Sequence, residues 1–124
     1  MRITKDDVLN IYRILTIETG GTVGIRDEGL LLSALEAPYQ TFGGVELFPT
    51  LIEKTVRMGY GLVANHPFID GNKRIGILVM LTFLQLNGIE INFIDVEIVD
   101  MALGVASGKY KYEDLLHIVN KKIA

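Results

Sequence analysis

The run over residues 75–86, Ile-Gly-Ile-Leu-Val-Met-Leu-Thr-Phe-Leu-Gln-Leu, constrains the fold more than any other stretch of the chain. Wound into an α-helix, this run is apolar on every face, and a helix that is hydrophobic all round must be buried all round. It is too short for a membrane span, which needs roughly 20 apolar residues. The run therefore predicts the central helix of a small helical bundle.

Two cations stand at the start of this predicted helix, in the tetrapeptide Gly71-Asn72-Lys73-Arg74. The first backbone N–H groups of a helix have no intrahelical partner, and the helix dipole is positive at that end. Both properties favour an anion, and the charges of Lys73 and Arg74 add to them. A phosphate group is the natural ligand for such a helix start.

Length, charge and composition narrow the class of protein. A chain of 124 residues with 49% hydrophobic content predicts one domain, residues 1–124, around one core. The net charge of -3 gives no electrostatic footprint for nucleic acid or an anionic membrane, so neither is expected as a partner. No cysteine is present, and residues 1–7 lack the apolar segment of a signal peptide. We therefore expect a cytoplasmic protein.

Local signals mark the first helices. Thr4 as N-cap, with Asp7 in the first turn, predicts a helix over residues 5–18. Asp27 is expected to cap a second helix that ends before Pro38. A side chain so placed could also approach a bound nucleotide, but the N-cap is the simpler role for Asp27.

Residues 39–49 change character, because Gly43-Gly44 lies between aromatic and aliphatic residues. This composition suits a short hairpin or an ordered loop. Its exposed aromatic side chains would dock an extended partner, or the loop would fold back over the core with Phe42 and Phe48 as plugs. The sequence leaves both alternatives open.

Capping signals also bound the later helices. Thr50 and Glu53 form a capping box, Gly88 is a C-cap glycine, and Asp95 is expected to cap the helix after it. Residues 89–94 read as an edge strand or a plain connection. Further helices are expected over residues 51–65, 75–86, 96–107 and 112–122. The predicted fold is all-α, a compact bundle of about six helices around a buried central helix, with at most a small hairpin flap.

The segment over residues 66–74 supplies the groups that phosphoryl or nucleotidyl transfer needs. His66, with an ordinary pKa of about 6.5, can accept a hydroxyl proton at neutral pH, although a lone histidine is often only a structural hydrogen-bonding group. Asp70 is a hard oxygen ligand of the kind Mg²⁺ takes, or alternatively the N-cap of the central helix. Phe68 is expected to anchor the loop in the core.

Phosphate contacts are expected from the residues that follow. Gly71 allows a phosphate to approach the backbone closely. Asn72 offers a carboxamide donor, and Arg74 offers a planar fork suited to phosphate oxygens. Without a ligand, Lys73 and Arg74 would be a solvated face.

The pattern His66-x-Phe68-x-Asp70-Gly71-Asn72-Lys73-Arg74 resembles the signature of the Fic/Doc superfamily. Residues 24–35 and 104–108 also look like the death-on-curing (Doc) toxins of that superfamily. The resemblance implies a six-helix Fic fold, with ATP and Mg²⁺ as cofactors. It also implies roles for single residues: general base for His66, metal ligand for Asp70, and phosphate contacts for Asn72, Lys73 and Arg74.

Two departures from the commoner Fic pattern bear on the reaction. Lys73 stands where AMP-transferring members usually have glycine, and Ile77 stands where they have a second arginine. In Doc-like proteins the nucleotide is held inverted and presents its γ-phosphate. The resemblance thus implies phosphorylation of a protein hydroxyl, with translation elongation factor Tu as target and blocked translation as result.

Other functions remain as alternatives. The chain is either this kinase-like toxin, a Fic-type protein adenylyltransferase, or a non-catalytic member that binds a nucleotide or partner. No glutamate follows Ser or Thr by four residues, so no inhibitory helix of the Fic type is encoded in this sequence. The resemblance then implies a small antitoxin protein. The sequence does not locate its docking groove, for which apolar residues of the 42–48 loop and of the first helices are the candidates. Arg26 is a further candidate for approaching the nucleotide, and His117 is expected to be a surface or half-buried residue of the last helix.

Overall fold

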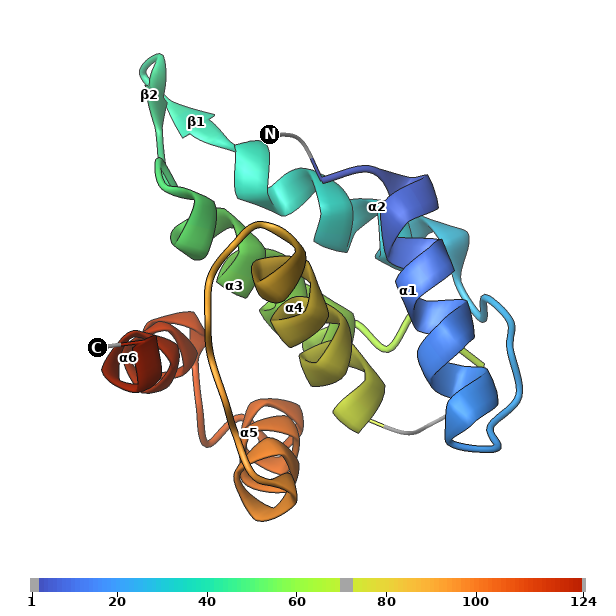
Figure 1. Cartoon of the computed structure of the whole chain (residues 1–124). Helices are drawn as coiled ribbons and strands as arrows, with labels where there is room; N and C mark the ends of the chain where they lie inside the picture. Colours follow the sequence, from blue (N-terminus) through green and yellow to red (C-terminus); the bar gives the residue numbers. More distant parts are fainter. Residues whose placement is uncertain (1–2, 70–72, 124) are drawn as a thin grey trace.

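The computed structural model describes residues 3–69 and 73–123. Within these residues the chain forms six α-helices, one short 3₁₀-helix and one two-stranded hairpin (Figure 1). The elements are α1 (Lys5–Glu18), α2 (Glu28–Glu36), η1 (Ala37–Tyr39), β1 (Thr41–Phe42), β2 (Val45–Glu46), α3 (Leu51–Ala64), α4 (Arg74–Leu86), α5 (Asp95–Ser107) and α6 (Tyr112–Ile123). The expected all-α bundle with a small hairpin is confirmed.

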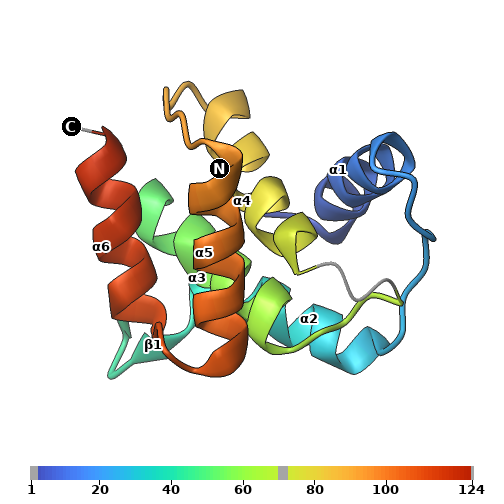
Figure 2. The same cartoon turned by 90° about the horizontal axis from the view of Figure 1, so that it is seen from below.

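Helix α4 lies at the centre of the bundle. Both views show α1 on one side of it and α5 and α6 on the other (Figures 1 and 2). Ile75 and Val79 pack into a core shared with α1 and α2, whereas Ile77 and Leu84 pack into a second core shared with α5 and α6. The prediction of a helix buried on every face is confirmed up to Leu84, whereas Gln85 and Leu86 at its end are exposed. Among the described residues, no helix combines the length and the apolar character that a membrane crossing requires.

The predicted capping residues set most of the helix ends. The Thr4 hydroxyl and the Asp27 carboxylate accept hydrogen bonds from backbone N–H groups in the first turns of α1 and α2. Thr50 and Glu53 form the reciprocal capping box of α3. Gly88 follows α4 with a φ of 84°, a left-handed conformation that glycine adopts without strain.

The cap assigned to α5 was wrong by one residue. The helix begins at Asp95 itself, and Ile94 occupies the N-cap position. The Glu97 carboxylate accepts a hydrogen bond from the Ile94 N–H at 3.0 Å. Glu97 thus provides a partner for the backbone N–H of the N-cap residue. Asp95 instead lies in the first turn, where its charge complements the helix dipole. Residues 89–94 form a plain connection without a strand.

Candidate functional site

The structure describes part of the motif segment. His66, Lys73 and Arg74 are described, whereas the predicted site residues Asp70, Gly71 and Asn72 lie outside the described residues. His66 follows α3 and is half-buried. Lys73 is half-buried at the N-cap position of α4, and Arg74 is exposed as the first residue of that helix. Lys73 makes no side-chain capping hydrogen bond. The alternative role of Asp70 as the N-cap of the central helix lies outside the described residues.

The described part of the motif loop, residues 65–69, runs close to the segment before α2 (Figure 2). Backbone hydrogen bonds join the two segments. The Arg26 and Asp27 N–H groups donate to the Pro67 carbonyl at 2.7 and 3.1 Å, and the Ile69 N–H donates to the Gly24 carbonyl at 3.1 Å. An isolated antiparallel bridge lies between them, at residues 25 and 68. Segments that are 40 residues apart in the sequence thus form one structural unit.

Phe68 anchors this unit in the core, as predicted. Its side chain is 7% exposed and stacks on the Tyr12 ring, with 3.7 Å between ring centroids and 8° between ring planes. The Tyr12 hydroxyl accepts the Gly24 N–H at 3.3 Å. The loop that carries His66 is therefore fixed from below by an aromatic pair that also holds the neighbouring segment.

Arg26 makes a contact that the sequence did not reveal. Its guanidinium donates to the His66 carbonyl from Nε at 2.9 Å and from Nη2 at 2.5 Å, and to the Asn65 carbonyl from Nη2 at 3.4 Å. The sequence suggested Arg26 only as a residue near the nucleotide. Hydrogen bonds from a side chain to backbone carbonyls leave no residue pattern at the accepting positions, so no sequence signal could have paired these segments. Asp27, in contrast, is the N-cap of α2, as expected.

The surroundings of His66 favour its neutral form. Partial burial lowers its pKa below the ordinary value, and the positive charges of Lys73 and Arg26 lower the pKa further. The imidazole is consequently unprotonated at neutral pH, and a neutral imidazole can accept a proton.

The structure also describes two further residues that the sequence singled out, Ile77 and His117. Ile77 is 0% exposed and belongs to the core with α5 and α6, so an apolar residue fills the place where a second arginine would stand. His117 is exposed on α6, as expected. Within residues 3–69 and 73–123, no three His, Asp or Glu side chains cluster in a way that could hold a metal ion.

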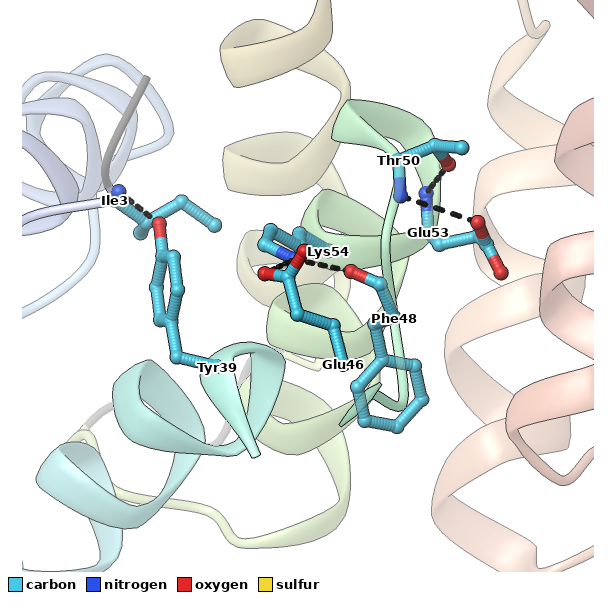
Figure 3. Close-up of polar contacts among 7 residues, drawn as sticks. All are labelled: Ile3, Tyr39, Glu46, Phe48, Thr50, Glu53 and Lys54. Atoms are coloured by element: carbon cyan, nitrogen blue, oxygen red, sulfur yellow. Dashed lines mark hydrogen bonds and ion pairs between the residues drawn. The ribbon is translucent and has the colours of Figure 1, made fainter. Parts of the chain in front are cut away.

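The hairpin is held on one side by a buried lysine (Figure 3). Lys54 of α3 is 8% exposed, and its ammonium pairs with the Glu46 carboxylate at 2.8 Å and donates to the Phe48 carbonyl. The same ammonium lies 5.5 Å from the centroid of the Tyr39 ring. The Tyr39 hydroxyl accepts the Ile3 N–H at 2.5 Å, so this network also reaches the N-terminal segment.

The other side of the hairpin is apolar and open to solvent. Phe42 and Val45 are register partners and are 81% and 69% exposed, and Leu47 is 49% exposed. Phe48 instead packs edge-on against Tyr112, with ring centroids 5.0 Å apart. Of the two alternatives left open, the one in which both phenylalanines fold back over the core does not hold for Phe42, whereas Phe48 is half-buried against Tyr112.

A second apolar surface lies between α1 and the end of α4. It is a groove of about 420 Å³ in which Ile14 and Leu86 are 58% and 72% exposed. The groove is lined by Asp7, Asn10, Ile11, Ile14, Phe83, Leu86 and Asn87. We call it the α1–α4 groove.

Comparison with known proteins identifies the family. The sequence model of the Fic/DOC family matches residues 2–84, which include α1 to α3, the motif loop and most of α4. This chain belongs to the Fic/DOC family. A curated relative, the protein named Toxin Doc of Mycolicibacterium smegmatis (strain ATCC 700084 / mc(2)155), is 37% identical over 87 residues. The match covers 70% of this chain and 65% of that relative, slightly less than two thirds of its length. Fic/DOC proteins are generally enzymes that transfer nucleotide-derived groups to proteins.

Proposed function

We propose that this protein is a Doc-like toxin that transfers the γ-phosphate of ATP to a hydroxyl group of a protein. The observation that carries the proposal is the position of two cations, Lys73 and Arg74, at the start of α4, where the charge of Lys73 lowers the pKa of the half-buried His66. The name of the relative, Toxin Doc, supports the toxin assignment.

In the proposed reaction His66 is the general base. Its imidazole nitrogen accepts the proton of the target hydroxyl, and the hydroxyl oxygen forms a bond to the γ-phosphorus. The bond between that phosphorus and the β,γ-bridging oxygen breaks, and ADP leaves with the bonding electrons. The lowered pKa of His66 keeps the base unprotonated at neutral pH.

Cations and backbone groups at the start of α4 bind the phosphates in this proposal. Lys73 and Arg74 provide positive charge, and Gly71 and Asn72 are assigned as further phosphate contacts. The described cations fit a polyphosphate, because charge-assisted hydrogen bonds to phosphate oxygens are strong. Asp70 would hold Mg²⁺, which supplies charge neutralisation to the phosphates when it is bound.

Lys73 and Ile77 favour γ-phosphate transfer over AMP transfer. Lys73 adds a cation at the helix start, and the buried Ile77 offers no charge for a phosphate one turn further along α4. The nucleotide would therefore bind with its phosphates next to the loop that carries His66. The exposed apolar face formed by Phe42, Val45 and Leu47 supports a protein as the acceptor. Translation elongation factor Tu is the proposed target.

Labelled ATP tests the proposal. The purified protein is incubated with elongation factor Tu and ATP that carries the label at either the α or the γ position. Transfer of the γ label alone is expected. Transfer of the α label would establish AMP transfer instead, and His66→Ala and Asp70→Ala variants that still inhibit growth would establish a function based on binding alone.

A small antitoxin protein is the proposed restraint on this activity, and the α1–α4 groove is its proposed docking surface. The groove is concave and apolar, whereas the hairpin face is left for the target. Co-purification with the product of a short reading frame upstream of the gene tests this assignment. Ile14→Glu should abolish the complex and Phe42→Glu should retain it, and the reverse result would place the antitoxin on the hairpin.

A further inference from the structure

The backbone of His66 is in a conformation that a histidine seldom adopts. Its φ is 51°, and among the described residues it is the only non-glycine residue with a positive φ. A side chain in the left-handed region is disfavoured unless its surroundings impose that conformation. Contacts around His66 must therefore stabilise the turn that directs its imidazole.

One residue supplies most of these contacts. Arg26 donates to three successive carbonyl groups of the loop: its guanidinium binds the carbonyls of Asn65 and His66, and its backbone N–H binds that of Pro67. These carbonyls belong to the peptide groups on both sides of His66 and to the next one. The orientations of the first two, on either side of His66, define its φ and ψ angles, and the third fixes the loop directly after it.

Arg26 is itself well positioned for this task. It stands directly before Asp27, whose carboxylate caps α2 by accepting the Leu30 N–H at 3.0 Å. On the N-terminal side of Arg26, the Gly24 carbonyl accepts a hydrogen bond from the Ile69 N–H, and the Gly24 N–H donates to the Tyr12 hydroxyl. A planar guanidinium can reach two neighbouring carbonyls at once, which the single ammonium group of lysine does not reproduce.

We propose that Arg26 is a positioning residue for the transfer reaction, which acts by holding the left-handed turn at His66. The inference rests on the proposed function for its kinetic test. Arg26 contacts only the backbone of the loop in this role and needs no contact with the nucleotide or the target.

Kinetics of three variants test the positioning role. Arg26→Ala should lower kcat by about 10²-fold, the loss expected when a reacting group is misplaced by about 1 Å, with little change in KM for ATP. Arg26→Lys keeps the charge but not the fork, so it should also lose kcat. Arg13→Ala, an exposed arginine on α1, is the matched control and should behave as wild type. A wild-type kcat in both Arg26 variants, or a rise in KM alone, would overturn the inference.

An NMR measurement separates this inference from the proposed function. The chain has two histidines, so the ring signals of His66 can be followed with those of the distant His117 as internal reference. Arg26→Ala should shift the ring and amide signals of His66 and leave those of His117 in place. Arg26→Lys provides the same comparison if the alanine variant does not fold. Unchanged His66 signals would overturn the inference even if the wild-type protein transferred no phosphate.

Discussion

At the scale of single residues, His66 combines a left-handed backbone with a lowered pKa. Strained backbone conformations and perturbed pKa values both concentrate at functional sites. Arg26 contributes to each property, because its donors hold the carbonyls of the loop while its charge disfavours the imidazolium form. The sequence alone could single out His66 as a candidate base. Its backbone conformation could not be predicted, because it depends on Arg26, which lies 40 positions earlier in the chain.

The lowered pKa of His66 predicts a pH dependence. In the free protein, NMR titration should give His66 a pKa below the ordinary 6.5. Lys73→Met should raise this pKa by removing a cation, and Lys121→Met on α6 should leave it unchanged. A pKa at or above 6.5 in the wild type would contradict this account.

The same shift links pH to stability. The unfolded chain binds the His66 proton at a higher pH than the folded chain does. The contribution to stability is therefore fully present above pH 6.5, falls as the pH drops below that value, and levels off below the folded pKa. For the same reason kcat/KM should rise with pH through the folded pKa and reach its plateau near neutral pH.

At the scale of elements, most helix ends could be predicted because their signals are local. Thr4, Asp27 and the Thr50–Glu53 pair each act on N–H groups within three residues. The hairpin could not be distinguished from a loop, because Lys54 on α3 fixes it through contacts with Glu46 and Phe48. Local sequence patterns thus predicted the helices, whereas the conformation of the hairpin depends on tertiary contacts that no local pattern shows.

Replacement of Lys54 should release the hairpin. Lys54→Met removes a nearly buried ammonium that binds a carboxylate and a carbonyl, and should lower the free energy of unfolding by about 1–3 kcal/mol. Amide hydrogen exchange in residues 41–48 should accelerate more than in α3. Lys122→Met is the control, because the Lys122–Glu97 pair has the same 2.8 Å distance but is solvent-exposed. Equal effects of the two substitutions would refute the anchoring role of Lys54.

The close approach of α3 and α4 requires a glycine. A Cβ atom on Gly76 would lie 2.8 Å from Val63 Cγ2 and 3.2 Å from the Val63 backbone nitrogen. Although alanine is favoured over glycine in helices by about 1 kcal/mol, Gly76→Ala should lower the free energy of unfolding by about 1–3 kcal/mol. Gly29→Ala on α2, where the nearest atom would be 3.4 Å away, should be neutral or stabilising. Urea denaturation of both variants measures the difference, and a stabilised Gly76→Ala would show that α4 can move away from α3.

At the scale of the whole molecule, α4 contributes to both cores of the bundle and carries two candidate site residues, Lys73 and Arg74, at its start. Its central, buried position could be predicted from apolar composition alone. The loop before it is fixed by α1 through the Tyr12–Phe68 stack and by the segment before α2 through Arg26. The position of the candidate site therefore depends on contacts with α1 and with the segment before α2.

The central claim is that His66 is the base of an ATP-dependent transfer to protein. It is tested most directly by the rate of γ-phosphate transfer to elongation factor Tu by the His66→Asn variant. Asparagine tolerates the left-handed backbone but cannot act as a general base at neutral pH. The variant should retain ATP binding and lose about 10²- to 10⁴-fold in transfer rate, while His117→Asn keeps the wild-type rate. Wild-type transfer by His66→Asn would contradict the claim.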